Sequence, residues 1–283
     1  MKLIKPSVTI REQGAGEQGL YEHIEWAGRH CYKSHDKTTS DSARKFVATI
    51  AKSGHGSVLE HGTIYLGIPA ADMPAELLTN PYTKCKLVHT PAIEDWYAVT
   101  TNYRVIVENN WDMLLMYECP PTTSHEKRIT AKFVTDRGVS HEFVRHRSHS
   151  MSQESQRYCN YNKDKFGGQI TFIQPSWWDT TSDSKESFKE GLLKAEEAYL
   201  TAVKAWDERK PDKRYRTGFK GNPLSPQAAR MILPNATKTE LVMTGFESDW
   251  EHFFELRCSP AAHPDARYLA EKLKSLITNS NGN

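Results

Sequence analysis

The sequence predicts one α+β domain with a mixed or antiparallel sheet and long helices. The predicted helices and strands do not alternate as strictly as a doubly wound parallel sheet requires. We also expect no glycine-rich phosphate loop, and hence no flavin or nicotinamide site of the Rossmann kind. A chain of 283 residues, 38% hydrophobic and 25% charged, can bury one full core. The expectation is a single non-Rossmann domain over residues 1–283.

Apolar spacing and runs of β-branched residues predict the individual elements. Helices are expected at residues 41–53, 139–144, 188–206, from 226 onward, 248–256 and 266–277. Strands are expected at residues 63–68, 103–107, 129–135 and 170–173. Ser248 and Glu251 have the spacing of a capping box, and residues 209–214 predict a charged surface loop.

Composition excludes several classes of function. The formal net charge of +2 gives no global field, so any anion site must be a local cluster. No run approaches the roughly 18 apolar residues of a membrane span, and residues 1–6 lack the apolar core of a secretory signal, so we expect a cytoplasmic protein. The five cysteines are scattered and unpaired in spacing, which favours reduced thiols. His55 and His61 are too far apart for a typical helical metal pair, and we expect no metal.

Residues 145–157 are the most informative segment of the chain. They read Arg-His-Arg-Ser-His-Ser-Met-Ser-Gln-Glu-Ser-Gln-Arg, with three guanidiniums, two imidazoles and four hydroxyls. Guanidiniums and hydroxyls hold phosphate through charge-assisted hydrogen bonds, so the segment indicates a site for polyanions. The competing interpretation is a solvated basic face.

Two other classes of function stay open on the residues alone. A nucleic-acid-binding module could use Arg145, Arg147 and Arg157 as phosphate clamps and Tyr158 and Tyr161 for stacking, although the chain has no wider basic surface. A metal-dependent hydrolase built on the histidines would be sensitive to chelators.

The order of residues in this segment resembles the signature of flavin-dependent thymidylate synthases. Arg145-His146-Arg147 is followed, after seven residues, by Ser155 and then by Gln156-Arg157-Tyr158. Three further segments fit the family: Glu60-His61 ahead of a strand, Ala229-Arg230 ahead of Leu233-Pro234, and Leu256-Arg257 at a helix end. The resemblance covers residues 55–68 and 129–267, about half of the chain.

The resemblance implies that the protein is a methyltransferase that converts dUMP into dTMP. The carbon would come from 5,10-methylenetetrahydrofolate, and the hydride from FAD that NADPH has reduced. It also implies a homotetramer with active sites at subunit interfaces. The other known route to dTMP needs an activated thiolate. Cys258 beside Arg257 and Cys159 near Arg157 are the candidates, and neither lies in a pattern typical of that enzyme.

The resemblance also assigns roles to residues. Arg257 would lie against the pyrimidine and favour its ionised form, and Ser155 is the second residue expected at the catalytic centre. The residues expected at FAD are His61, Thr63, Arg145, His146, Arg147, Ser148, Gln153 and His252. Those expected at dUMP are Glu142, Arg145, Gln153, Glu154, Ser155, Gln156, Arg157, Arg230 and Arg257.

The chain departs from the family pattern at several positions. Glu142 stands where a Gln is frequent, and Gln153 where many members have Glu. Phe246, Ser248 and His252 occupy a stretch that commonly supplies Asn and Arg to the flavin, and His252 is the best substitute. Residues 71–128 exceed what a compact member needs and are expected to be an insertion, rich in helix, with the strand at residues 103–107.

Overall fold

A four-stranded antiparallel sheet forms the centre of the computed structural model, which describes residues 1–91, 94–179, 183–209 and 225–280. Its strand order is β2-β6-β9-β7. These strands are β2 (Ser7–Arg11), β6 (Arg128–Asp136), β9 (Lys238–Phe246) and β7 (Ser150–Gln153). The long strands β6 and β9 pair over their full length and carry the sheet.

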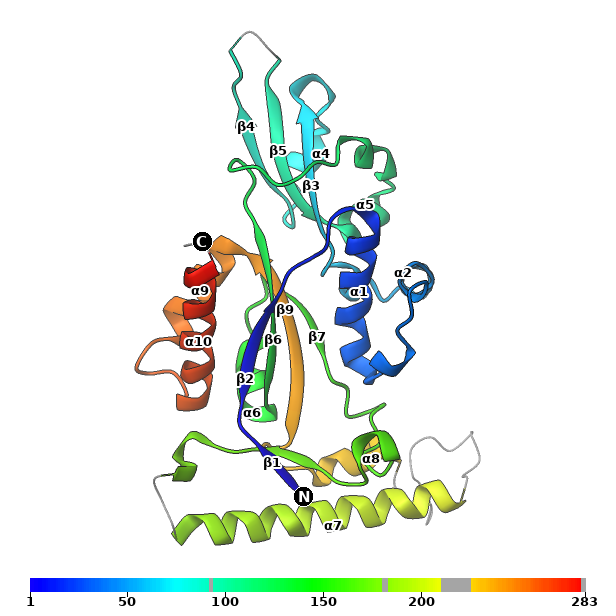
Figure 1. Cartoon of the computed structure of the whole chain (residues 1–283), viewed down its shortest axis with the longest axis vertical. Helices are drawn as coiled ribbons and strands as arrows, with labels where there is room; N and C mark the ends of the chain where they lie inside the picture. The colour runs from blue at the N-terminus through cyan, green and yellow to red at the C-terminus, as the bar shows by residue number, and fades with distance from the viewer. Residues whose placement is uncertain (92–93, 180–182, 210–224, 281–283) are drawn as a thin grey trace.

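One face of this sheet is apolar and is covered by helices (Figure 1). The covering helices are α6 (Arg137–Phe143), α9 (Glu247–Arg257) and α10 (Pro264–Ser280). Successive side chains of a strand point to opposite faces, so Ala131 and Phe133 reach the helices while Thr130 points away. Trp250 and Phe253 of α9 are fully buried against Phe133. This packing fixes α9, and with it the position of its last residue.

The opposite face of the sheet is polar and is covered by α1 (Gly16–Tyr32). Thr130, Thr244 and Ser152 of the sheet are buried there, as are His23 and His30 of α1. Buried polar groups cost free energy unless they are hydrogen-bonded to one another. The interface between α1 and the sheet is therefore a hydrogen-bonded layer rather than an apolar core.

A smaller antiparallel sheet, in the order β3-β5-β4, projects from one end of the molecule (Figure 1). It consists of β3 (Thr63–Pro69), β5 (Trp96–Asn102) and β4 (Lys84–Val88). Its apolar side chains share a core with α1 and with α2 (Ser42–Lys52), α3 (Gly56–Leu59) and α5 (Tyr103–Asn109). Helix α4 (Ala75–Leu78) lies in the same part of the chain, and its Leu77 is buried in that core.

The other end of the molecule is closed by the long helix α7 (Asp183–Arg209) (Figure 1). It packs on a third core with the parallel pair β1 (Lys2–Ile4) and β8 (Thr171–Ile173) and with α8 (Pro226–Ala229). The short 3-10 turns are η1 (His35–Lys37), η2 (Ala70–Asp72), η3 (Asp112–Tyr117), η4 (Asp164–Phe166), η5 (Ser176–Asp179) and η6 (Arg230–Ile232). No helix in the described ranges is long and apolar enough to cross a membrane.

The α+β fold class is confirmed, and most predicted elements are present as α2, α6, α7, α8, α9, α10, β3, β6 and β8. The strand predicted at residues 103–107 is wrong, because this segment is helix α5. The Asn102 side chain accepts a hydrogen bond from the backbone N–H of Val105 at 3.2 Å and so caps the helix. The predicted loop at residues 209–214 lies, beyond Arg209, outside the described residues.

One other local expectation is also wrong. Helix α9 is capped by the Asp249 carboxylate, which accepts from the backbone N–H of Phe246 at 3.1 Å, so Ser248 lies inside the first turn rather than at its cap. The chain does have a Gly-x-Gly-x-x-Gly spacing, with Gly14 between β2 and α1 and with Gly16 and Gly19 in the first turn of α1. The fold is nonetheless not of the Rossmann kind, because β2 pairs antiparallel with β6.

Candidate active site

The C-terminal ends of α6 and α9 bring three predicted site residues together. The Arg257 guanidinium donates through Nε to Nε2 of His146 at 2.9 Å. It also donates through Nη1 to the Glu142 carboxylate at 2.6 Å and through Nη2 to the Glu142 backbone carbonyl at 2.8 Å. A guanidinium with three fixed partners is held in one orientation, as a group that acts on a bound ring must be.

His146 serves as a neutral acceptor in this arrangement. Burial lowers the pKa of His146 to about 4, and the charges of Arg257 and His252 act in the same direction. The His252 ring lies 6.4 Å from the His146 ring, is largely exposed and pairs with Glu255 at 3.5 Å. A protonated imidazole has no acceptor nitrogen, so the geometry of Arg257 depends on an uncharged His146.

The turn between α6 and β7 presents three residues expected at FAD to solvent. Arg145, Arg147 and Ser148 are exposed, and neither guanidinium forms an ion pair with any residue that the structure describes. The Ser148 hydroxyl lies 3.3 Å from Nδ1 of the buried His149. Two unpaired guanidiniums and a hydroxyl on one turn are a donor set that fits a pyrophosphate.

The segment after β7 holds Ser155 in a fixed backbone conformation. The Ser155 N–H donates to the Cys31 carbonyl at 3.0 Å, and its hydroxyl accepts from the Arg157 N–H at 3.3 Å. Arg157 is exposed and donates through Nε to Gln227 of α8 at 3.2 Å. Within the described ranges no histidine bonds to Ser155 Oγ, so this hydroxyl is a hydrogen-bonding group rather than an activated nucleophile.

Two further cations lie close to this segment. Arg230 is exposed in η6, directly after α8, and Arg137 begins α6. Burial lowers the pKa of Arg137, and the nearby charge of Arg230 lowers it further. Gln153 and Arg137 share Thr239 Oγ1 as acceptor, at 3.3 and 3.5 Å. Arg157 bonds to α8, and Arg230 follows α8 and lies near Arg137, so these cations together favour an anion.

Glu154 lies in a buried cluster of four charges that the sequence did not predict. Lys238 Nζ is 2.7 Å from a Glu154 oxygen and 2.8 Å from a Glu240 oxygen, and Lys33 also pairs with Glu240. Burial alone would raise the pKa of Glu240, yet the two lysines hold it well below its usual range. The Tyr161 hydroxyl donates to Glu154 at 3.3 Å. The neighbouring Gln156 is half-buried.

His61 stands at the centre of the polar layer under α1. Its ring is fully buried, with Nδ1 at 2.8 Å from Thr244 Oγ1 and Nε2 at 3.0 Å from Ser152 Oγ. Thr244 Oγ1 lies 2.8 Å from Thr130 Oγ1, which lies 3.0 Å from Nε2 of His23. Burial keeps the pKa of His61 well below its ordinary value. A continuous hydrogen-bonded chain therefore runs from His23 through His61 to β7.

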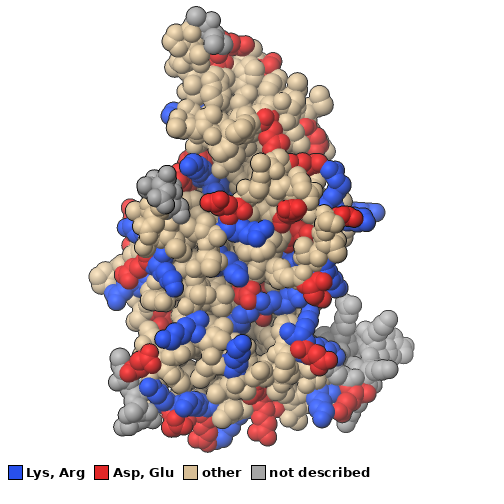
Figure 2. All heavy atoms as spheres, viewed as in Figure 1, with Lys and Arg blue, Asp and Glu red and all other residues tan. Residues whose placement is uncertain are grey.

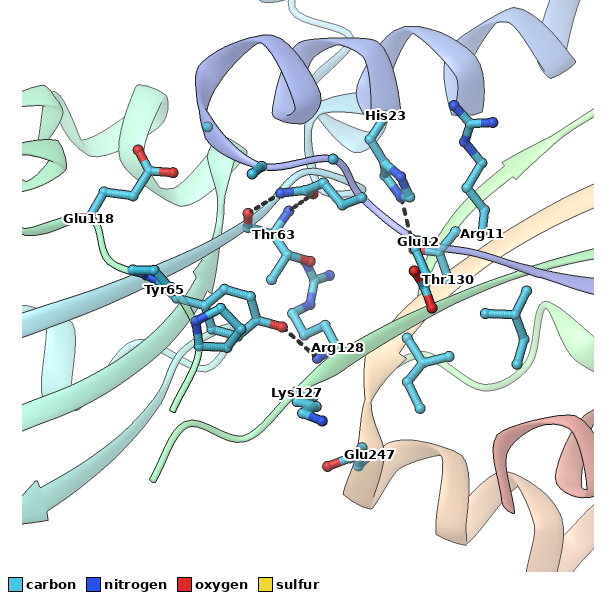
Figure 3. Close-up of a pocket in the computed structure, with 18 of the residues that line it drawn as sticks. Arg11, Glu12, His23, Thr63, Tyr65, Glu118, Lys127, Arg128, Thr130 and Glu247 are labelled. Carbon is cyan, nitrogen blue, oxygen red and sulfur yellow. Dashed lines mark hydrogen bonds between the residues drawn. The ribbon is translucent and has the colours of Figure 1, made fainter. Parts of the chain in front are cut away.

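A cavity of about 670 Å³ lies at the His23 end of this chain (Figure 3). Among the predicted site residues that the structure describes, Thr63 is the one that lines this cavity. The cavity wall is organised by Arg128, which donates to the Glu60 carbonyl at 3.0 Å, to Thr63 Oγ1 at 3.3 Å and to Ser150 Oγ at 3.1 Å. Because Ser150 belongs to the segment of residues 145–157, this last bond connects that segment to the cavity wall.

None of the five cysteines is a poised thiolate. All are free, and burial raises the pKa of each thiol. Cys159 is fully buried with a pKa of about 12, and burial also raises the pKa of Cys258 despite the adjacent Arg257. A covalent thiolate mechanism requires the opposite shift.

Sequence reasoning missed several groups around these sites. In the sequence, Arg128 is only a cation directly ahead of a predicted strand. Lys33 and Lys238 are far apart in the sequence, and only the fold brings them together. The glycines at 14, 16 and 19 have a Gly-x-Gly-x-x-Gly spacing that can be read from the sequence. Within the described ranges, no group of three His, Cys, Asp or Glu residues is arranged to hold a metal.

The chain resembles known proteins of one family. The model of a family described as thymidylate synthase complementing protein matches residues 121–280, more than half of the chain. A solved UMP/dUMP methylase from Streptomyces cacaoi aligns with a TM-score of 0.46 at 14% identity, covering 99% of this chain and 92% of that one.

Curated relatives carry the name flavin-dependent thymidylate synthase. One from Mycolicibacterium vanbaalenii is 26% identical over 257 residues, covering 90% of this chain and 74% of the relative. One from Geobacter sulfurreducens is 30% identical over 141 residues, covering 50% of this chain and 52% of the relative. One from Mycolicibacterium gilvum is 32% identical over 142 residues, covering 50% and 54%. The chain thus spans about half the length of the last two relatives, and it belongs to the flavin-dependent thymidylate synthase family.

Proposed function

We propose that this protein converts dUMP into dTMP, with 5,10-methylenetetrahydrofolate as carbon donor, FAD as the hydride-carrying cofactor and NADPH as its reductant. The observation that carries the proposal is the Arg257 arrangement: the fold holds this guanidinium against Glu142 and against His146, which belongs to the segment of residues 145–157. When bound, the flavin supplies the hydride. The protein binds, orients and polarises the nucleotide.

Arg257 is assigned the electrostatic step. C5 of uracil becomes nucleophilic when negative charge develops on the ring, and a fixed cation stabilises that charge. A single preorganised donor of this kind contributes about 3 kcal/mol to lowering a barrier. The partner Glu142 partly offsets the charge, while its backbone carbonyl and His146 keep the guanidinium in place.

The dUMP phosphate is assigned to the region around α8. Ser155 and Arg157 offer a hydroxyl and a guanidinium there, and Arg137 and Arg230 add two cations. Charge-assisted hydrogen bonds from such groups hold a phosphate strongly. FAD is assigned to the exposed turn with Arg145, Arg147 and Ser148, whose donors match its pyrophosphate.

A homotetramer with active sites at subunit interfaces is part of the proposal. Arg145, Arg147, Arg157 and Arg230 are exposed in the single chain. A flavin and a nucleotide need to be shielded from water for the chemistry to proceed, and a neighbouring subunit would shield both.

The raised thiol pKa values support flavin chemistry over thiolate attack. The nucleic-acid-binding alternative finds no support on the face shown in Figure 2, where Lys and Arg side chains are interspersed with Asp and Glu. A binding surface for nucleic acid is expected to be a continuous basic patch.

The test is dTMP formation by the purified protein with FAD, NADPH, dUMP and the folate, compared between wild type and Arg257→Ala. We expect Arg257→Ala to lose about a hundredfold or more in kcat while still binding FAD, because one preorganised donor contributes this much. Arg267→Ala is the matched control, since Arg267 makes a surface ion pair with Glu271 on α10. Full turnover by Arg257→Ala would remove Arg257 from the mechanism.

A further inference from the structure

A buried cluster of charges lies where β7, β9 and the C-terminal end of α1 meet (Figure 1). It consists of two carboxylates and two ammonium groups, those of Glu154, Glu240, Lys33 and Lys238. The side chain of Glu154 is 1% exposed and that of Lys238 is 13% exposed. A buried set of this kind is often no more stabilising than apolar side chains of the same volume. The proposed function assigns these four side chains no role, so their place in the fold needs another explanation.

Lys238 holds both carboxylates of the cluster. Its Nζ donates to Glu154 at 2.7 Å and lies 2.8 Å from a Glu240 oxygen. Lys33 also pairs with Glu240, but its Nζ is 3.9 Å from the Glu154 oxygen. Burial alone would lower the pKa of Lys238, yet the two carboxylates raise it above its ordinary value, so this ammonium is charged at neutral pH. Lys238 is therefore the main positive partner of Glu154.

Glu154 fixes the point at which the chain leaves the sheet. Its N–H donates to the Glu240 carbonyl of β9 at 2.8 Å, which continues the pairing of β7 by one residue. The next residue, Ser155, donates through its N–H to the Cys31 carbonyl at the end of α1 at 3.0 Å. The Tyr161 hydroxyl donates to the Glu154 carboxylate at 3.3 Å. The chain thus passes from β9 to α1 within two residues, and the Glu154 side chain is bonded on both sides at this step.

A single turn follows Glu154 and carries two groups assigned to the dUMP phosphate. The Ser155 carbonyl accepts from the Cys159 N–H at 2.9 Å, and the Ser155 hydroxyl accepts from the Arg157 N–H at 3.3 Å. The Arg157 guanidinium donates to Gln227 at 3.2 Å. Because the bonds within this turn converge on Ser155, a displacement of Glu154 would move the Ser155 hydroxyl and the Arg157 guanidinium together.

We propose that Lys238 is a positioning residue for the dUMP phosphate, because it holds Glu154 and thereby sets where Ser155 and Arg157 lie. This inference rests on the proposed function, which assigns the phosphate to those two residues. Arg257, which is assigned the electrostatic step, shares no hydrogen-bond partner with Lys238 among the residues that the structure describes. Sites without shared partners act independently. Lys238 should therefore govern the affinity for the nucleotide and leave the chemical step unchanged.

The test measures dUMP binding by isothermal titration calorimetry and dTMP formation by steady-state kinetics, both with the full-length protein loaded with FAD. Lys238→Met keeps the length of the side chain and removes its charge. We expect the Kd and the KM for dUMP to rise about tenfold or more, because displaced donors lose charge-assisted hydrogen bonds to the phosphate. The kcat at saturating dUMP should stay within about twofold of the wild type, since binding and not chemistry is weakened.

Three further variants separate positioning from stability. Lys238→Arg restores the charge and should return the Kd to within about threefold of the wild type. Lys194→Met is the matched control, since Lys194 makes an exposed ion pair with Glu190 on α7, and it should change nothing. A buried carboxylate that loses its partner destabilises a protein, so Lys238→Met should lower the melting temperature and the double variant with Glu154→Gln should recover part of it. Binding of dUMP should stay weak in the double variant, because the link between residues 154 and 238 is still missing.

A raised KM with a retained kcat, restored by Lys238→Arg, supports the positioning role. Wild-type affinity for dUMP in Lys238→Met would overturn it. Affinity that recovers together with the melting temperature in the double variant would also overturn it, because Lys238 would then only stabilise the fold. Should Lys238→Met fail to fold, the double variant provides the same comparison with the wild type. A wild-type protein that does not bind dUMP would overturn the proposed function, and this inference with it.

Discussion

Arg257 shows how single residues acquire a role only through partners distant in the chain. The order of the Arg145–Arg157 motif and the Leu256-Arg257 pair could be read from the sequence. That Arg257 bonds to Glu142, 115 residues away, could not, because no local pattern encodes the contact between α6 and α9. Likewise, the sequence suggests that the Glu154 carboxylate is free to bind a ligand, but inside the protein it accepts a hydrogen bond from Lys238.

Glu142→Gln tests the electrostatic account at this residue. The substitution removes the counter-charge of Arg257, while the Glu142 backbone carbonyl and His146 still hold the guanidinium. We expect kcat/KM for dUMP to stay at the wild-type value or to rise by up to about tenfold, since an ion pair near the surface has an energy of a few kcal/mol before screening. Steady-state kinetics check this, and a loss of more than about tenfold would show that the carboxylate itself is required.

At the scale of elements, the helices and strands that could be predicted are those whose apolar pattern is complete within their own segment. Helix α2 and strand β3 were predicted because their apolar periodicity is regular, and because Gly54 shortly after the helix and Pro69 at the end of the strand mark where they stop. Strand β9 was missed because both its faces are buried, which removes the alternation. Helix α1 was missed because His, Arg and Glu side chains are buried among its apolar positions, which obscures the apolar stripe of Leu20, Ile24 and Ala27. We still propose that residues 71–128 are an insertion.

Helix α5 gives an element-level prediction within this region. Its N-cap is the buried Asn102, so Asn102→Ala should lower the free energy of unfolding by about 1 kcal/mol. Asn102→Asp, which can accept the same hydrogen bond from Val105, should lower it less. Urea denaturation measures both. Equal stability of Asn102→Ala and wild type would mean that the cap contributes nothing and that residues 103–109 are helical for another reason.

At the scale of the whole molecule, buried neutral histidines make stability depend on pH. Burial lowers the pKa of His23 and His146 to about 4 and that of His30 and His149 to about 3, all from 6.5. Between pH 6.5 and these values the unfolded chain binds protons that the folded chain does not. The free energy of unfolding must therefore fall as the pH falls through this window.

The expected slope is at most about 1.4 kcal/mol per pH unit for each such histidine. Denaturant unfolding at a series of pH values from 7.5 to 4.5 would measure it. Replacing His146 with Gln should flatten the slope, whereas replacing the exposed His55 should leave it unchanged. Stability that stays constant or rises on acidification would contradict the neutral state of these imidazoles, and with it the hydrogen bond from Arg257 to His146.

We infer that the molecule makes dTMP with a hydride from flavin and without a thiolate. The most direct measurement is a single turnover under anaerobic conditions, with chemically reduced FAD, dUMP and 5,10-methylenetetrahydrofolate, and with NADPH omitted. We expect dTMP to form at up to one equivalent per bound flavin, and equally in Cys258→Ala. Absence of dTMP with reduced FAD, or dTMP formation that persists without flavin and stops in Cys258→Ala, would contradict it.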